Sequence, residues 1–361
     1  MDPKQKKHAV LIIHGIGEQR PMDTLRGFVN TVWDENTTIH AKDRPFKTYS
    51  KPDEVTEMFE LRRLTTSYNS GNIRTDFYEY YWAHLMEGNK LSHIIAWFKR
   101  LLFVGVKNLP RPIVRLLLFL CLLLSILVVL AYFLYGWLAT FDSNIIKWIG
   151  YLFSIILIPA LITITEGYVG DAARYLDPSP KNIKRRQNIR ETGIKILKKL
   201  NESDKYNRIT IVGHSLGSVI AYDLLIHYWP TITSEIPKGA HIPNTNILQD
   251  YIKHTAEFKI KEFQKLQLKA NLELRQKGFK WLVSDLITLG SPLTYSDILL
   301  ASNKQDLQNK IRQREFSICP PELNDDDLTY SNKENQTRQP KHHSVFAFTR
   351  WTNLYFESRK I

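Results

Sequence analysis

The chain has 361 residues, 43% of them hydrophobic, and a formal net charge of +13 at pH 7. This length and apolar share exclude a chain that is disordered throughout. The basic residues are spread along the sequence and form no cluster interleaved with aromatic residues, so we do not expect a nucleic acid partner. With two cysteines and no spacing typical of metal ligands, the sequence indicates no disulfide framework and no metal site.

The first predicted unit is a strand, a turn and a helix. Residues 9–13 are wholly apolar, and apolar side chains recur at helical spacing from Leu25 to Trp33. Two further strands are expected at Met58–Leu64 and Asp76–Trp82, of which the second is rich in tyrosine. This succession is typical of an α/β domain.

Two uncharged segments follow. The first, Leu116–Thr140, has 25 residues, and as a helix it would be about 37 Å long, enough to cross a hydrocarbon core of ~30 Å. The second, Trp148–Thr165, has 18 residues and is just long enough to return. Basic residues flank the pair on one side, which predicts cytoplasmic ends. We expect an inserted transmembrane hairpin; the alternatives are two buried helices of a soluble core, or a re-entrant second segment.

The most informative segment is Asn207–Ser218. Its β-branched run ends in Gly213-His-Ser-Leu-Gly217, and an apolar segment of helical length, Val219–Tyr228, comes next. This is the setting of a nucleophile elbow, a strand-to-helix turn so tight that it needs small residues two positions before and after the serine. The two glycines meet that need, so Ser215 is the candidate nucleophile.

An acyl-transfer site also needs backbone amides that stabilise an oxyanion, and some of them come from a loop after an early strand. The motif His14-Gly-Ile-Gly-Glu-Gln19 fits this role, because Gly15 and Gly17 let the backbone approach the reacting carbonyl. We expect the amides of Ile16 and Leu216 to face each other across the oxyanion. The histidine of the motif is expected to be structural, hydrogen-bonded under the loop.

The remaining elements complete the predicted domain. A helix is expected at Arg185–Leu200 and a strand at Ser284–Leu289, whereas residues 319–343 are expected to be a solvated loop. Residues 247–277 contain no Gly or Pro and are predicted to form one long charged helix, an insertion. The predicted parts are residues 1–110 for the first portion of the domain, 111–168 for the hairpin, and 169–361 for the portion that carries the nucleophile.

On these motifs, the sequence resembles the α/β-hydrolase superfamily, and more narrowly a group of bacterial membrane-associated lipase-like serine hydrolases. The resemblance implies an α/β fold with a central, mostly parallel sheet flanked by helices. It also implies a serine esterase or lipase activity without a cofactor, and a transmembrane insertion ahead of the nucleophile. The likeness rests on five blocks, which are His14–Gln19, Gly170–Tyr175, Gly213–Ser218, Thr288–Leu293 and Arg350–Phe356.

The catalytic acid and base are where the sequence departs from this pattern. In the superfamily an Asp or Glu and then a His follow the nucleophile in the chain, and similar proteins are expected to carry the histidine beyond the last of the five blocks. The chain stops at Ile361, so we expect the usual acid and base to be missing. Among the residues present, Asp297 followed by His342 or His343 keeps the required order. An N-cap for the aspartate and ordinary loop positions for the histidines are the alternative.

The expected function is a membrane-anchored serine hydrolase that cleaves a lipid or another acyl ester through an acyl-enzyme on Ser215. The resemblance places it in the bacterial inner membrane with the hydrolase domain on the cytoplasmic side. A catalytically inactive binding or scaffold protein with the same fold is the first alternative, since Ser215 without a base is a poor nucleophile. An acyltransferase or a thioesterase is the second. The sequence points to no particular protein partner.

Overall fold

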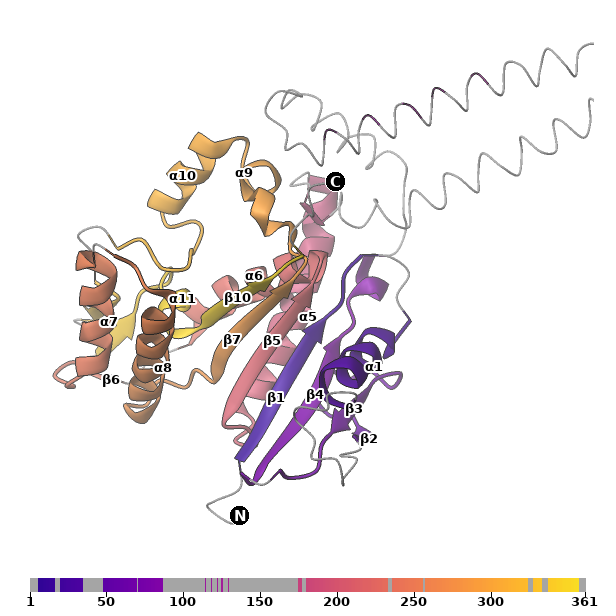
Figure 1. The fold of residues 1–361 in the computed structure, drawn as a ribbon, viewed down its shortest axis with the longest axis horizontal. Coiled ribbons are helices and arrows are strands. Elements are labelled where there is room, and N and C mark those ends of the chain that lie inside the picture. Colours follow the sequence, from indigo (N-terminus) through magenta and orange to yellow (C-terminus); the bar gives the residue numbers. More distant parts are fainter. Residues whose placement is uncertain are drawn as a thin grey trace, which may run out of the picture.

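The computed structural model describes residues 6–16, 20–34, 48–69, 71–86, 114, 118, 122, 125, 129, 175–176, 180–232, 236–255, 257–323, 327–332 and 337–356. Seven strands form one sheet in the order β10-β7-β5-β1-β4-β3-β2 (Figure 1). These are β1 (Lys6–Ile13), β2 (Tyr49–Pro52), β3 (Arg62–Thr65), β4 (Ile73–Tyr80), β5 (Arg208–His214), β7 (Val283–Leu289) and β10 (Arg350–Leu354).

The sheet is mostly parallel. The strands from β10 to β4 run parallel to their neighbours, whereas β3 is antiparallel to both β4 and β2. The register aligns the ends of the strands, because Ile13 at the end of β1 pairs with both Tyr80 of β4 and Gly213 of β5. The carboxyl ends of the parallel strands therefore meet at one edge, and their amino ends meet at the other.

Helices cover both faces of the central strands. In β1, Leu11 and Ile13 belong to one buried cluster, which includes residues of α5 (Pro180–Glu202) and α6 (Leu216–Tyr228). Ile12 belongs to a second cluster with residues of α1 (Asp23–Val29), which continues as a π-helix at Asn30–Asp34. A parallel strand buried on both faces has no position for a polar side chain, and this explains the uninterrupted apolar run of residues 9–13.

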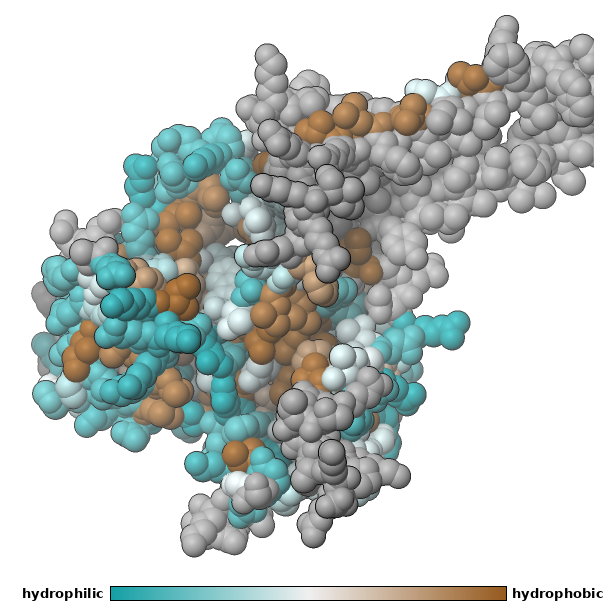
Figure 2. Space-filling view, viewed as in Figure 1, coloured by the Kyte–Doolittle hydropathy of each residue, from teal (hydrophilic) through white to brown (hydrophobic). Residues whose placement is uncertain are grey.

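The second face is covered less completely than the first. Ile287 and Leu289 of β7 pack against the cluster of α1 but are only partly buried. In the same orientation as Figure 1, Figure 2 shows apolar residues gathered over the central strands, with polar residues around them. The described helix α1 thus shields part of this face, and the strands next to it retain some exposed apolar area.

The predicted long helix at residues 247–277 was wrong, because the segment contains two helices, α7 (Pro243–His254) and α8 (Ile260–Gln276). Between them Thr255 and Lys259 are extended, so that α8 folds back on α7. Glu273 of α8 accepts hydrogen bonds from the amides of Asn244 and Thr245, at 2.9 and 2.8 Å. These amides lie in the first turn of α7 and have no intrahelical acceptor. Packing between the helices, rather than a Gly or Pro, decides the turn.

The expected solvated loop at residues 319–343 was also wrong in part. It contains β8 (Thr329–Asn332) and β9 (Thr337–Pro340), which form a second sheet with β6 (Ile236–Pro237). Leu323 and Leu328 of this segment are buried in the main core. The segment is therefore anchored to the domain, although its polar composition predicted a solvated loop. The remaining short helices are η2 (Ala83–Met86), η4 (Trp229–Thr231), η5 (Pro292–Tyr295), α9 (Ser296–Leu299), α10 (Lys304–Arg312) and α11 (Val345–Phe348).

The prediction of a transmembrane hairpin is contradicted. Of the helices that the structure describes, none has both the length and the apolar composition that a bilayer crossing requires. Apart from five single positions, residues 111–168 lie outside the described residues. A span requires one apolar helix of about 20 residues, whereas the prediction rested on two uncharged segments and on the basic residues that flank them. The same finding weighs against the predicted integral location in a bacterial inner membrane.

A buried ion pair joins the two helices behind the nucleophile strand. Arg190 of α5 donates to the carboxylate of Asp223 on α6 from Nε at 3.0 Å and from a terminal nitrogen at 2.6 Å. The hydroxyl of Tyr175 donates to the same oxygen at 2.7 Å. Burial, with the Asp223 charge next, raises the pKa of Tyr175, so its hydroxyl remains a donor at neutral pH. The last residue of the block Gly170–Tyr175 thus has a structural role in fixing α6.

We predict that Asp223→Ala lowers the free energy of unfolding by about 3 kcal/mol, because it leaves the Arg190 guanidinium largely buried without its carboxylate. Urea unfolding followed by circular dichroism measures the change. The control is Asp250→Ala on α7, which removes an exposed carboxylate and should change stability by less than about 0.5 kcal/mol. Equal effects of the two substitutions would contradict the structural role of the pair.

Candidate active site

The candidate nucleophile lies where the sheet changes its direction of winding. From β1 the chain adds β4, β3 and β2 on one side, and then β5, β7 and β10 on the other, so β1 and β5 are neighbours at the switch point. In open α/β sheets, ligands bind outside the carboxyl ends of the strands at such a point. The two strands end at Ile13 and His214, and the predicted oxyanion loop and the elbow follow them directly.

Ser215 occupies the turn between β5 and α6 in a backbone conformation that L-residues rarely adopt. Its φ is 50° and its ψ is −124°. A non-glycine residue at positive φ costs on the order of 1–3 kcal/mol, and such residues concentrate at functional sites. Ser215 is half-buried, so its side chain reaches the surface. The strained turn therefore presents the hydroxyl at the N-terminal end of α6, as a nucleophile elbow requires.

The two elbow glycines are required by close backbone packing. A Cβ at Gly213 would lie 2.5 Å from Cα of Ser218, and a Cβ at Gly217 would lie 2.3 Å from the carbonyl oxygen of Ile13. Both distances are far shorter than any real contact. The first turn of α6 thus lies directly against the end of β1, and a side chain at Gly217 would force the two apart. A side chain at Gly213 would instead collide with the first turn of α6.

The loop after β1 lies beside the nucleophile. A Cβ at Gly15 would lie 3.0 Å from Cβ of Ser215. Ile16, the next residue, packs partly buried against the main core. Gly17 lies outside the described residues. The structure thus brings Gly15 and Ile16 next to the elbow, where Leu216 begins α6 and its amide has no intrahelical acceptor.

His14 has a structural arrangement. It is fully buried and stacks on Trp82, with ring centroids 5.0 Å apart. Its Nδ1 donates to the carbonyl oxygen of Gly15 at 2.8 Å, and its Nε2 accepts from the backbone amide of Trp82 at 3.2 Å. Burial lowers the pKa of His14 to about 4. The neutral ring therefore uses both nitrogens to hold the loop and has none left to take a proton from Ser215.

Two polar groups at the elbow were not singled out from the sequence. Ser218 Oγ lies 2.5 Å from the carbonyl oxygen of Ser215 and 2.6 Å from Oγ of Ser291. The amide of Ser215 donates to the carbonyl oxygen of Leu289 at 2.9 Å, at the end of β7. Ser291 belongs to the block Thr288–Leu293, so the signal was present as a motif. Only the fold shows that this block supports the elbow.

The predicted acid and base are described but not joined. Asp297 lies in the first turn of the short helix α9. His342 is exposed, and its Nε2 lies 3.3 Å from the carbonyl oxygen of Arg314. His343 is buried, and neither of its ring nitrogens has a hydrogen-bond partner. No hydrogen bond between described residues connects these side chains with one another or with Ser215, so the triad stays a prediction.

Burial lowers the pKa of His343 to about 4, and the charges of His342, Arg314 and Lys341 lower it further in the same direction. The ring is therefore neutral at pH 7, which is the form that a general base needs. The charges of two other histidines, His84 and His214, contribute to the lowered pKa of His14, which shows that both rings lie near it. Both are exposed. His84 belongs to η2, which follows β4, and His214 is the last residue of β5, inside the elbow motif.

A buried carboxylate supports the far end of the loop. Glu79 on β4 pairs in register with Ile12, and one carboxylate oxygen accepts from the amide of Met22 at 2.7 Å. Met22 itself has a φ of 76°. The other carboxylate oxygen is buried without a partner. Burial raises the pKa of Glu79 to about 7, and the charge of Asp23 acts in the same direction. The hydrogen bond from the Met22 amide opposes this shift.

Within the described ranges, no group of three or more His, Cys, Asp or Glu side chains is placed to hold a metal ion. Comparison of the chain with protein-family models, with curated proteins and with solved structures gave no match. The assignment of the site therefore depends on its geometry. That geometry provides a strained, accessible serine, a helix N-terminus behind it, and a glycine-containing loop against it.

We predict that Gly217→Ala destabilises the fold by at least about 3 kcal/mol, since the added Cβ would meet the Ile13 and His14 carbonyl oxygens at 2.3 and 2.4 Å. Thermal and urea unfolding measure this. The control is Gly27→Ala in α1, where a Cβ meets nothing within 4 Å. That substitution should stabilise the chain by about 0.5–1 kcal/mol. A Gly217→Ala protein as stable as the parent would contradict the packing of β1 against α6.

We predict that the Glu79→Gln variant becomes more stable relative to the parent protein as the pH rises. Because the pKa of Glu79 is raised from 4.5 to about 7 in the folded state, the folded protein binds more protons than the unfolded chain between these values. Its free energy of unfolding therefore falls as pH rises through this window. Relative to the parent, the glutamine variant should gain about 1–3 kcal/mol between pH 4 and pH 8. A pH-independent difference in urea unfolding would contradict the raised pKa.

Proposed function

We propose that this chain is a serine hydrolase of the α/β-hydrolase type that cleaves acyl esters through an acyl-enzyme on Ser215. The observation that carries the proposal is the positive φ of 50° at Ser215, in a strand-to-helix turn at the switch point of the sheet. A strained non-glycine residue at this place has no structural benefit that a glycine would not supply better. A nucleophile, by contrast, requires a side chain there.

In the proposed first step, the Ser215 hydroxyl attacks the ester carbonyl and its proton passes to a general base. The carbonyl oxygen becomes an oxyanion, which the amides of Ile16 and Leu216 stabilise together with the N-terminal end of α6. Loss of one such donor in a hydrolase costs about 10²–10³ in rate. The alkoxide leaves with a proton, and water then releases the acid from the acyl-enzyme. This chemistry uses only protein groups and water.

The rigidity of the surroundings supports this assignment. His14, Trp82 and Glu79 are buried and hold the loop after β1 from both of its ends. Ser218, Ser291 and the Leu289 carbonyl hold the elbow from the side of β7. Oxyanion stabilisation depends on donors that are fixed before the reaction begins, and these contacts are of the kind that fixes them.

A catalytically inactive binding protein is the second candidate, and one observation favours it. Among the described residues, no imidazole is hydrogen-bonded to the Ser215 hydroxyl, and His14 has both nitrogens engaged. A serine without a base reacts slowly. The two candidates therefore differ in one measurable property, the reactivity of Ser215.

We predict that a fluorophosphonate probe labels the full-length chain and that Ser215→Ala abolishes the label. Hydrolysis of a p-nitrophenyl ester should fall by at least about 10³-fold in the same variant. The control is Ser302→Ala, an exposed serine outside the site, which should leave both signals unchanged. Labelling that survives Ser215→Ala would refute the elbow assignment. Absence of labelling in the parent protein would favour the inactive binding protein.

The base is identified by single alanine variants of His342, His343, His84 and His214. Loss of labelling by orders of magnitude at His342 or His343 would support the base predicted from the sequence. Loss at His84 or His214, with the other two variants fully active, would instead assign the base to the edge that carries Ser215. In either case the unfolding curve of each variant must match that of the parent protein. This check is needed because His343 is buried, and loss of its ring would also affect the fold.

A further inference from the structure

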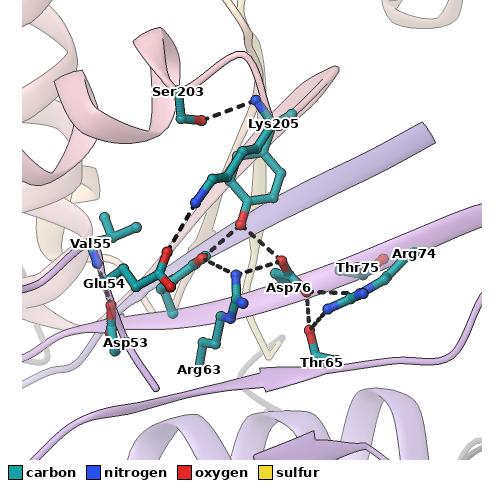
Figure 3. A network of polar contacts seen from close by, with 12 residues as sticks. Asp53, Glu54, Val55, Arg63, Thr65, Arg74, Thr75, Asp76, Ser203 and Lys205 are labelled. Atoms are coloured by element: carbon teal, nitrogen blue, oxygen red, sulfur yellow. Dashed lines mark hydrogen bonds and ion pairs between the residues drawn. The ribbon is translucent and has the colours of Figure 1, made fainter. Parts of the chain in front are cut away.

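A cavity of about 210 Å³ lies at the opposite edge of the sheet from Ser215. It is lined by the amino-terminal parts of β1 and β4, by β2 and β3, and by the loop that leads into β5. Figure 3 shows the polar contacts that Arg63, Arg74 and Asp76 of this lining make. A single water needs about 10–15 Å³ of such volume, so the cavity has room for a polyatomic ligand. The lining residues are Lys7, Lys51, Glu54, Arg63, Arg74, Asp76, Lys205 and Tyr206.

The lining is strongly cationic. Five of its side chains are Lys or Arg and two are carboxylates, so the formal charge around the cavity is +3. Glu54 is exposed and pairs with Lys205 at 2.9 Å, on the solvent side of the network. The side chains of Lys7 and Lys51 form no ion pair with any residue that the structure describes. The excess of positive charge is therefore concentrated on groups that a ligand can still engage.

The inner wall of the cavity is fixed in place. Asp76 is buried and accepts from Arg63 at 3.3 Å and from the hydroxyl of Tyr206 at 2.9 Å, and it also accepts from Thr65. Arg74 lies 3.4 Å from the same carboxylate. This carboxylate holds both guanidinium groups without cancelling their combined charge. Nε of Arg63 is buried and has no hydrogen-bond partner, whereas Nε of Arg74 is the atom that faces the Asp76 carboxylate.

We propose that this cavity is a binding site for a small phosphorylated anion. Two arginines and three lysines around one space match the several oxygens and the double charge of a phosphoryl group. A simple monocarboxylate would neutralise only part of the excess charge. The size of the cavity suits a phosphoryl group with a small organic or phosphate substituent, and not a polymer. The site is on the opposite edge of the sheet from Ser215 and is independent of the chemistry proposed there.

The experiment is a calorimetric titration of the full chain with pyrophosphate at constant ionic strength, with acetate as the control anion. We expect saturable binding of one pyrophosphate and no saturable binding of acetate. The test variant is the double substitution Lys7→Gln with Lys51→Gln, which should weaken binding by at least about tenfold. The matched control is Lys265→Gln with Lys269→Gln, two exposed lysines of α8 that remove the same charge elsewhere. This control should bind like the parent.

Unfolding curves of both double variants accompany the titrations, and Lys51→Gln alone serves as a second test if the first variant is unstable. Absence of pyrophosphate binding in the parent would overturn the proposal, and so would equal weakening in the two double variants. Vesicles that contain phosphatidic acid form a separate arm, since a lipid headgroup carries the same phosphoryl chemistry. Binding to those vesicles without binding of free pyrophosphate would also overturn the proposal of a small soluble ligand.

Discussion

The contact on which the structure most depends is the one between the end of β1 and the first turn of α6. Gly217 lies so close to the carbonyl oxygens of Ile13 and His14 that even a methyl group would not fit between them. This contact joins the two strands at the switch point of the sheet and brings the loop after β1 against Ser215. The rest of the sheet is built on this pair, because β7 and β10 add to β5 on one side and β4 adds to β1 on the other.

Buried polar groups then hold the backbone that this contact brings together. The loop after β1 lies close to Ser215, and polar contacts as well as side-chain packing hold its backbone in place. Here His14 and Glu79 bind backbone groups at the two ends of the loop, and Ser291 binds the elbow through Ser218. His14 and Glu79 are buried, and their pKa values move to about 4 and about 7 as a consequence. The strain at Ser215 persists because these neighbours determine its position from several sides.

The two edges of the sheet have different chemistry. The carboxyl ends of the strands carry Ser215 and backbone donors, whereas the amino ends carry the cationic cavity around Asp76. Parallel strands allow this division, since all of their amino ends meet at one edge and all of their carboxyl ends meet at the other. Lys7, Arg74 and Tyr206 are far apart in sequence, and each lies at or just before the start of a strand. The basic residues are spread along the sequence and indicated no nucleic acid partner, whereas the fold gathers five of them around the cavity.

The sequence by itself determined the elements whose signals are local. The apolar run of residues 9–13, the two glycines around Ser215 and the apolar segment that follows are each readable within a dozen residues, and strand, turn and helix form there. Tertiary structure alone decided which of these elements meet. It placed Gly15 beside Ser215, brought Ser291 under the elbow, broke residues 247–277 into two helices through Glu273, and assembled the cationic cavity. Local spacing predicts the conformation of a short segment, whereas the neighbours of that segment depend on strand order and register, which are set by contacts across the whole chain.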